Sequence, residues 1–572
     1  MLAAVFVYLA LVLPNETELL TPSSFVHLPV EGIIGTAVLL LLPSRASRIA
    51  AAVMGLTLGL LTLLTFLDLG FSSVLDRPFD LLLDWILFGN AESFLRDTLG
   101  QAGGVLAVIG VAVLAVAVVV LMTLAVVRLN ALMNRHNGVT TRTALLFSTV
   151  WVTCMALGLE IAGTPVASRT TTDLVQNHAD LVSAGLRDGK EFQKAAANDR
   201  FRNVPNDQLL AGLRGKDVIF TFIESYGRSA IEDPEMGPPV TEVLNEGTER
   251  LKAAGFEARS GFLTSPVSGA GSWLAHTTFM SGMWVNNQQR YRTVTTSDRL
   301  TLTSAFGRTG DWRTVGIMPG VTRSWPEGKF FGLDNIYDSR NIGYQGPKFS
   351  WSPVPDQYSL DAYERLEHGK KDREPLMTEM VLASSHNPWS PLPTMVGWDE
   401  IGDGSIYHGI KKKGTDPTET LKDPAKLRVA YRTSIEYSLT SLIEWLERYG
   451  DDNTVLVFLG DHQPNSRVTG PGADWDVPVS IVARDPAVME RISGWNWHEG
   501  LKPEPDAPVW RMDTFRNHFL QAYDGEAPAG TKPGTEPEAK PDTKPDTKPD
   551  TKPDTEPDTE PDTAQAKGRA AE

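Results

Sequence analysis

Long apolar runs dominate the first third of the chain, and five of them precede residue 165. The third, fourth and fifth are long enough to cross the ~30 Å hydrocarbon core of a bilayer as helices. The second carries Glu31 near its start, which suits the membrane interface. The first is short, and a signal peptide is its alternative. The pattern predicts an α-helical membrane domain of about five transmembrane helices, at Leu2–Leu13, Phe25–Leu42, Ile49–Leu69, Gly103–Val127 and Ala144–Ile161.

Charged residues between the apolar runs predict how this membrane domain is oriented. Arginines lie between the second and third runs and between the fourth and fifth, whereas the other connections carry mainly acids. Loops rich in Lys and Arg face the cytoplasm. We therefore expect a multi-pass protein of the plasma membrane, with residues 1–163 as its anchor and everything after them outside the cell.

After residue 163 the long apolar runs give way to short ones. Residues 164–215 are polar and predict a linker or stalk. Over 216–527, strand patterns alternate with amphipathic helices, which predicts an extracellular α/β domain with a mainly parallel sheet sandwiched by helices. Strands are expected at Val218–Ile223, Arg313–Met318, Leu376–Leu382 and Val477–Val482 and from Thr454 to Gly460, and helices at Thr241–Ala254, Trp273–Met280 and Lys426–Tyr449.

The end of the chain, residues 528–572, contains a repeat of Lys or Glu followed by Pro, Asp and Thr. Proline at every fourth position removes amide donors, and the charged residues leave little apolar surface to bury. We expect an extended, disordered tail. A spacer in the cell wall and a low-complexity repeat without function are the two hypotheses for its role.

Composition narrows the classes of partner. The chain is acidic, with a net charge of −17, and no basic face of the kind that follows a phosphate backbone stands out, so we expect no nucleic-acid partner. Its single cysteine, Cys154, lies in an apolar run. A disulfide within the chain and a cysteine-rich metal site are therefore excluded.

Two predicted strands end in residues that can bind a metal. Glu224 directly follows the strand Val218–Ile223, and a buried acid there requires a metal, an arginine or access to solvent. Asp461 and His462 follow Gly460, beyond the end of another buried strand, where open α/β sheets bind ligands. A carboxylate beside an imidazole favours a divalent ion such as Zn²⁺ or Mn²⁺. The structural alternatives are a salt bridge for Glu224 and a turn cap for Asp461.

Two further residues can take part in group transfer. Ser272 is expected at the N-terminus of the helix Trp273–Met280, where exposed amides favour an anion and a metal can activate a hydroxyl nucleophile. The alternative for Ser272 is an ordinary helix N-cap. His386 follows the strand Leu376–Leu382 and can bind a phosphate or protonate a leaving group.

Other polar and aromatic residues near these motifs are interpreted as structural. His276 lies one turn into the helix that Ser272 begins, and we assign it no chemical role. Asp356 and Asp403 are interpreted as exposed acids in turns. The tryptophans are expected in core or rim packing, with a pocket for a sugar or a lipid glycerol as the alternative: Trp273, Trp325, Trp351, Trp389 and Trp398.

These motifs together resemble a known group of enzymes. The membrane anchor followed by Phe-Ile-Glu224-Ser, Gly271-Ser272-Trp, Ser385-His386-Asn-Pro-Trp and Gly460-Asp461-His462-Gln is similar to the sulfatase-like branch of the alkaline phosphatase superfamily. Within it, the architecture resembles the lipoteichoic acid synthases, which are membrane phosphoglycerol transferases. The architecture matches over about residues 1–525, whereas the motifs lie within 217–465.

The resemblance implies roles for the same residues. Glu224, Ser272, Asp461 and His462 would hold a catalytic divalent ion, manganese in the synthases, with zinc or magnesium as alternatives. Ser272 would be the nucleophile. His386 would bind the substrate phosphate or assist the leaving group.

Three departures from the family limit what the resemblance implies. The synthases use threonine as nucleophile, where this chain has Ser272. Their glycerol-phosphate pocket uses a Trp and an Arg, and the comparable region Thr322–Lys329 does not align clearly. The motif that true sulfatases convert to formylglycine is absent.

The leading hypothesis is therefore a membrane-anchored, metal-dependent phosphotransferase or phosphodiesterase that forms a covalent phospho-enzyme. Its substrate would be a membrane lipid head group or a cell-envelope polymer. The alternatives are a sulfuric or phosphoric ester hydrolase that uses the same residues, and an inert, metal-stabilised envelope-binding protein.

Overall fold

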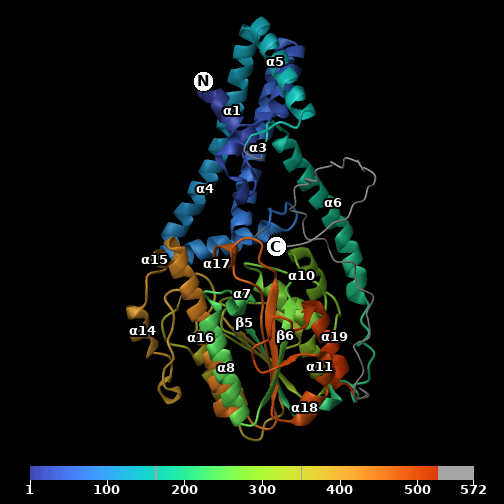
Figure 1. The fold of residues 1–572 in the computed structure, drawn as a ribbon, viewed down its shortest axis with the longest axis vertical. Coiled ribbons are helices and arrows are strands. Elements are labelled where there is room, and N and C mark those ends of the chain that lie inside the picture. Colours follow the sequence, from blue (N-terminus) through green and yellow to red (C-terminus); the bar gives the residue numbers. More distant parts are fainter. Residues whose placement is uncertain (76, 162–163, 350, 526–572) are drawn as a thin grey trace, which may run out of the picture. The chain divides into compact units, whose positions relative to one another are not determined.

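A nine-stranded mixed sheet forms the centre of the chain after residue 216 (Figure 1). The structure is a computed structural model that describes residues 1–75, 77–161, 164–349 and 351–525. The tail predicted over 528–572 and the boundaries predicted at 163 and 527 lie outside the described residues. The nine strands are β5 (Asp217–Ile223), β6 (Glu257–Thr264), β7 (Arg313–Met318), β8 (Asn335–Asp338), β9 (Leu376–Leu382), β10 (Thr454–Gly460), β11 (Asp476–Ala483), β12 (His498–Glu499) and β13 (Val509–Arg511).

The middle of the sheet is parallel, as the sequence predicts. Strands β10, β5, β9, β7 and β8 are parallel neighbours in that order. Every residue of β5 and of β10 is buried, which explains why both are almost continuously apolar. The other side of the sheet departs from the prediction, because β11 pairs antiparallel with β10 and with β6. The segment between β10 and β11 contains only the four-residue helix α17 (Ser466–Thr469), too short for a parallel crossover.

Helices cover both faces of this sheet (Figure 1). On one face, α8 (Gly237–Ala253), α13 (Asp356–Tyr363) and α16 (Pro424–Tyr449) contribute to one hydrophobic cluster. On the other, α9 (Ser272–Ser281), α11 (Leu302–Thr309), α18 (Pro486–Glu490) and α19 (Met512–Tyr523) contribute to a second. The sandwich predicted from the sequence is confirmed. The remaining helices are α7 (Ser229–Glu232), α10 (Gln288–Thr295), α12 (Gly328–Phe331), α14 (Tyr407–Lys413) and α15 (Pro417–Lys422).

All five N-terminal apolar runs are helical, but they differ in length. Only two described helices are long and apolar enough to cross a membrane, over Ser44–Ser73 and Gly100–Arg135. The first two helices have 11 and 12 residues, fewer than the roughly 20 needed for a span. The five-span count and the outward placement of the α/β domain therefore stay predictions. The five helices are α1 (Leu2–Val12), α2 (Val30–Leu41), α3 (Ser44–Leu75), α4 (Leu87–Arg135) and α5 (Asn137–Ala156).

The polar linker is largely one helix, α6 (Thr170–Ala197). Short strands precede it: β1 (Leu28–Pro29) pairs with β4 (Ala167–Ser168), and β2 (Glu160–Ile161) with β3 (Thr164–Pro165). Glu31 in the first turn of α2 accepts hydrogen bonds from the Thr172 amide (2.8 Å) and hydroxyl (2.9 Å). A carboxylate at a helix N-terminus satisfies amides that have no partner within the helix. The acid that the sequence placed at the membrane interface therefore caps the linker helix.

Candidate active site

The register of three neighbouring strands brings the strand-end residues to one edge of the sheet. Ile223 lies opposite Gly460 on one side and opposite Leu382 on the other. These three parallel strands therefore end together, and the residues that follow them, Glu224 and Asp461 among them, emerge side by side. The Ser385 hydroxyl donates a 2.6 Å hydrogen bond to the main-chain carbonyl of Glu224, which ties the loop after β9 to the same edge.

Ser272 reaches this edge from the start of α9. It is the first residue of the helix, and Gly271 before it has φ +97°, a left-handed conformation that glycine adopts without strain. The Ser272 hydroxyl donates to Glu224 Oε2 over 2.9 Å and lies 3.2 Å from His462 Nε2. The N-cap residue of α9 is Gly271, so Ser272 is the first residue inside the helix. The interpretation of Ser272 as a helix N-cap is therefore wrong.

The hydrogen bond of His462 fixes which ring nitrogen faces the cluster. Its Nδ1 lies 2.8 Å from the Gln463 carbonyl. Because a carbonyl can only accept, Nδ1 carries the proton and neutral His462 presents the lone pair of Nε2. That atom lies 3.5 Å from Glu224 Oε1. A histidine held in this way by a main-chain carbonyl is the usual arrangement for a metal ligand.

Asp461 supplies the strongest indication of a cation. Its Oδ1 accepts hydrogen bonds from the amides of Ser225 and His462, both at 2.7 Å. Its Oδ2 is buried and has no hydrogen-bond partner among the described residues. Leaving a buried carboxylate oxygen unpaired costs about 1–3 kcal/mol or more. A bound ion would remove that cost.

The spacing of the donor atoms fits a divalent ion. Donor atoms of Glu224, Asp461 and His462 all lie within 4.8 Å of one another, and all three residues are buried. Two ligands bound to one ion at about 2.1 Å lie about 3.0–3.5 Å apart, close to the observed 3.5 Å between Glu224 and His462. Oxygen and nitrogen donors suit Mn²⁺, Zn²⁺ or Mg²⁺. The described residues therefore pass the test for a metal site, and the identity of the metal is open.

The pKa values of the two acids, Glu224 and Asp461, are shifted in opposite directions. Burial, together with the negative charge of Asp461, raises the pKa of Glu224. Burial alone would also raise the pKa of Asp461, but the nearby histidines and the amide hydrogen bonds outweigh it and hold that pKa below its usual range. Two buried carboxyl groups in contact repel each other when both are ionised. A cation between them would let both stay ionised.

Ser225 beside Glu224 has a left-handed backbone with φ +56°, which is uncommon for a residue other than glycine. Hydrogen bonds hold it there. Its amide donates to Asp461, and its carbonyl accepts from the Tyr431 hydroxyl over 2.7 Å. Such conformations persist at functional sites when the surroundings determine them fully.

His386 lies in the loop after β9, next to the donor cluster. Its Nδ1 lies 2.7 Å from the Asn387 carbonyl, so Nδ1 carries the proton. Its imidazole stacks on the Trp351 indole with ring centroids 4.3 Å apart. The charge of His386 lowers the pKa of Glu224 in opposition to burial. The structure therefore brings all five proposed residues to the same edge of the sheet, and their catalytic and metal-binding roles stay proposals.

Asp356 corrects a prediction made from local sequence. Its side chain is fully buried, whereas the turn-like sequence predicts exposure. It accepts hydrogen bonds from the Ser384 amide (2.9 Å) and the Ser438 hydroxyl (2.6 Å). Burial raises its pKa to about 6. Asp356 thus supports the loop that carries His386, whereas Asp403 is exposed as expected.

The tryptophans divide into two groups. Trp389 is buried and donates from its indole to the Ser385 carbonyl, in agreement with a packing role. Trp273 and Trp351 are 36 % and 37 % exposed. Trp273 follows the proposed nucleophile, and its indole donates to Gln288 of α10 over 3.2 Å. Only these two of the five expose a large aromatic surface near the site.

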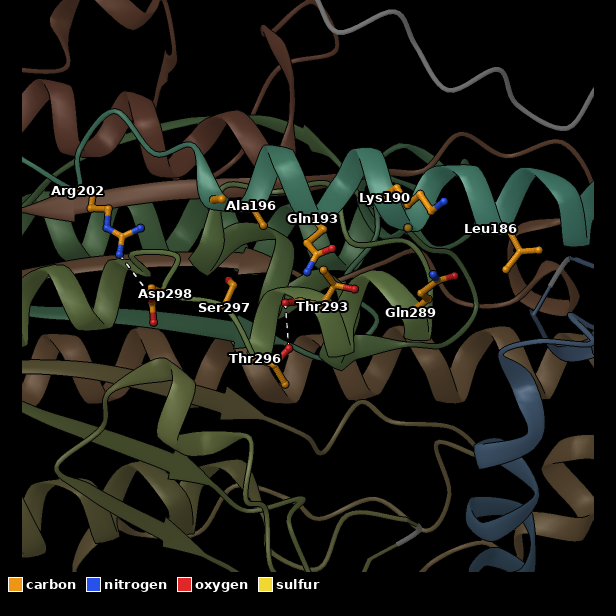
Figure 2. A pocket seen from close by; sticks show the side chains of 12 residues that line it. Leu186, Lys190, Gln193, Ala196, Arg202, Gln289, Thr293, Thr296, Ser297 and Asp298 are labelled. Atoms are coloured by element: carbon orange, nitrogen blue, oxygen red, sulfur yellow. Dashed lines mark hydrogen bonds and ion pairs between the residues drawn. The ribbon is translucent and has the colours of Figure 1, made fainter.

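The hollow drawn in Figure 2 lies elsewhere, between α6 and α10. It has a volume of about 520 Å³ and contains none of the proposed site residues. Its lining mixes uncharged polar side chains such as Gln193 and Gln289 with apolar and charged ones. Arg202 pairs with Asp298 at 3.3 Å. The proposed site therefore lies outside this hollow.

Comparisons with known proteins find remote structural likenesses. No family model and no curated protein matches the chain. Among solved structures, the lipoteichoic acid synthase LtaP from Listeria monocytogenes has 17% identity over 60% of this chain and 79% of its own, with a TM-score of 0.37. The Streptococcus pyogenes phosphoglycerol transferase GacH in complex with sn-glycerol-1-phosphate has 11% identity over 58% and 79%, with a TM-score of 0.34.

A protein in the alkaline phosphatase superfamily from Vibrio parahaemolyticus has 17% identity over 52% of this chain and 69% of its own, with a TM-score of 0.32. These names agree with the superfamily that the motifs resemble. Because all three identities are below 25% and all three TM-scores below 0.5, the functional proposal rests on the geometry of the site.

Proposed function

We propose that this chain is a membrane-anchored, metal-dependent phosphotransferase or phosphodiesterase that acts on lipid head groups or cell-envelope polymers outside the membrane. One observation carries the proposal. The Ser272 hydroxyl stands at the start of α9, 2.9 Å from Glu224 and 3.2 Å from His462, beside the unpaired oxygen of Asp461. A hydroxyl at a helix N-terminus and a cation site together suit attack on an anionic phosphorus centre.

The proposed metal ligands are Glu224, Ser272, Asp461 and His462. A bound divalent ion would lower the pKa of the Ser272 hydroxyl and neutralise charge on the phosphoryl oxygens. The amides of the first turn of α9 add positive potential on the same side. The family resemblance favours manganese, and the donor set also suits zinc and magnesium.

The proposed reaction has two steps. First, the Ser272 hydroxyl loses its proton to solvent, and a bond forms between Oγ and phosphorus while the bond from phosphorus to the leaving alcohol breaks. His386, protonated on both ring nitrogens at this stage, gives from Nε2 the proton that the leaving oxygen takes up, while its Nδ1–H stays on the Asn387 carbonyl. Second, an acceptor hydroxyl or water attacks phosphorus and gives its proton to Nε2 of His386, the bond from phosphorus to Oγ breaks, and Oγ takes up a proton from solvent.

The test uses the full chain, solubilised in detergent and loaded with Mn²⁺, with bis-p-nitrophenyl phosphate as a generic phosphodiester. Ser272→Ala is expected to lower turnover by about 10³-fold or more, because the nucleophile is lost. Ser272→Thr is the matched control, since it keeps a hydroxyl at the same place. Metal-dependent turnover that persists in Ser272→Ala contradicts the mechanism.

A second measurement separates transfer from the alternative functions. Mass spectrometry of the wild type, quenched during turnover of labelled envelope lipids, is expected to find a phosphate-containing adduct on Ser272. A labelled acceptor lipid then indicates transfer, and release of free head group indicates hydrolysis. If neither adduct nor product forms, the inert envelope-binding protein is the better description.

A further inference from the structure

Two buried polar atoms face each other beside the proposed nucleophile. His276 Nε2 lies 3.6 Å from Asp461 Oδ2, too far for a hydrogen bond. Each atom is buried, and neither has a hydrogen-bond partner in the part of the chain that the structure describes. The Asp461 side chain is wholly buried and that of His276 is 13 % exposed. Two such atoms aimed at each other need an explanation, because each alone is costly to bury.

The position of His276 is determined by its helix and its neighbour. It follows Ser272 by one helical turn on α9, so both side chains lie on the same side of the helix. Its ring lies against Phe222 of β5, with centroids 4.1 Å apart and planes inclined by 31°. This contact orients the imidazole edge toward Asp461.

His276 lies outside the set of metal donors. Among the described residues, the donor cluster consists of Glu224, Asp461 and His462, and His276 reaches it only through Asp461. A carboxylate oxygen has two lone pairs. One lone pair of Oδ2 can bind the ion while the other accepts the Nε2–H of His276, after a closure of less than 1 Å from the observed 3.6 Å.

We propose that His276 is a positioning residue that orients Asp461 for the metal by donating Nε2–H to Oδ2. The proposal rests on the metal site of the proposed function and extends it. Because His276 and Ser272 share α9, the same contact fixes the nucleophile's helix relative to the ion. Hydrogen-bond partners of this kind typically change metal affinity by 10–100-fold.

Two substitutions distinguish the contribution of the His276 N–H donor from that of its aromatic ring. His276→Phe keeps an aromatic ring against Phe222 but has no donor. His276→Gln loses the ring but places an amide donor at a similar reach. Mn²⁺ affinity of the full chain in detergent, measured by isothermal titration calorimetry, reads out the site without any turnover. The thermal midpoint of each metal-free variant shows that it is folded.

We expect His276→Phe to weaken Mn²⁺ binding about 10–100-fold and His276→Gln to stay within a few-fold of the wild type, with metal-free midpoints unchanged. Wild-type affinity in His276→Phe overturns the proposal, as does an equal loss in both variants. A wild type that does not bind Mn²⁺ overturns it as well.

Cobalt substitution tests whether His276 acts from outside the donor set. When saturated with Co²⁺, His276→Phe is expected to keep the visible absorption bands of the wild type, because the number of ligands is unchanged. Shifted bands would make His276 a direct ligand and overturn the positioning role. If Mn²⁺ binding depends on His276 but Ser272→Ala still turns over phosphodiester, this inference survives and the proposed function fails. If Ser272→Ala loses turnover but Mn²⁺ binding does not depend on His276, the proposed function survives and this inference fails.

Discussion

The indole of Trp351 lies nearly parallel to the imidazole of His386, with ring centroids 4.3 Å apart and planes inclined by 19°. Trp351 is 37 % exposed, so one aromatic surface stays open beside the histidine proposed to protonate the leaving group. The stacking contact holds the His386 ring in place.

Removing this ring is expected to impair the reaction without unfolding the chain. Aromatic stacking contributes about 0.5–1.5 kcal/mol beyond burial, so Trp351→Ala is expected to lower kcat/KM about tenfold. Steady-state kinetics with the generic phosphodiester measure this loss. Trp351→Phe keeps a ring and serves as control. Equal kcat/KM in all three proteins would show that the stack does not orient His386.

Removing divalent ions is expected to destabilise the chain. The buried carboxyl groups of Glu224 and Asp461 would lose the proposed cation that compensates their charge. An ion at 100 times its Kd stabilises a folded protein by about 2.7 kcal/mol, so EDTA should lower the thermal midpoint and Mn²⁺ should restore it. In Asp461→Asn the thermal midpoint should no longer respond to EDTA or to Mn²⁺. A wild-type midpoint that is indifferent to EDTA contradicts the metal site.

Asp356→Asn is expected to stabilise the chain at neutral and alkaline pH. Burial raises the pKa of Asp356 from 3.8 to about 6. Because the folded-state pKa is the higher one, this group's stabilising contribution is full below about pH 4 and is lost as the pH rises through 6. The asparagine keeps both hydrogen-bond positions and does not ionise, so a gain of about 1–3 kcal/mol is expected at pH 8.

Thermal midpoints of the wild type and Asp356→Asn between pH 4 and pH 8 measure this effect. The difference between the two proteins should be near zero at the acidic end and should grow through pH 6. A difference that stays constant over the whole range would show that Asp356 does not titrate there.

Gly460→Ala is expected to damage both the fold and the metal site. A Cβ at Gly460 would lie 1.8 Å from the Tyr226 carbonyl oxygen, so the backbone that carries Asp461 has to move. Overpacking of this kind costs about 1–3 kcal/mol or more. The thermal midpoint and Mn²⁺ affinity should both fall. Gly409 lies in α14, and a Cβ there would meet nothing within 4 Å, so Gly409→Ala should be neutral or slightly stabilising.

The single native cysteine makes the predicted orientation testable. In a Cys154→Ala background, His136→Cys lies between α4 and α5 and Glu504→Cys lies in the α/β domain, and both positions are exposed. A thiol reagent that does not cross membranes should label Glu504→Cys in intact cells and His136→Cys only after permeabilisation. The opposite pattern would place the proposed active site in the cytoplasm.

The sequence predicted the parallel core of the sheet well. The bounds expected for β7 and β9 are those observed, because strands buried on both faces are mainly apolar. Strand β6 was missed, since Glu257, Arg259 and Ser260 interrupt its apolar pattern. The antiparallel direction of β11 could not be predicted, because it depends on the connection between β10 and β11 and not on the residues of β11.

Site residues that directly follow a strand could be predicted from the sequence. Residues whose position depends on contacts with distant parts of the chain could not. Glu224 and Asp461 each follow an apolar run, so their convergence could be expected. His276 could have been found from its spacing of one helical turn after Ser272. The burial of Asp356 could not, because Ser384 and Ser438, which bind it, are far away in the sequence.

The common end point of β5, β9 and β10 has a consequence for how the protein matures. The proposed ligands Glu224 and Asp461 are far apart in the sequence, and they meet only when β5 and β10 are in register. An unfolded chain has no such arrangement, so it cannot retain an ion while it crosses the membrane. Under the proposed orientation, the ion is therefore acquired after export, and its identity depends on the metals outside the cell and not on those of the cytoplasm.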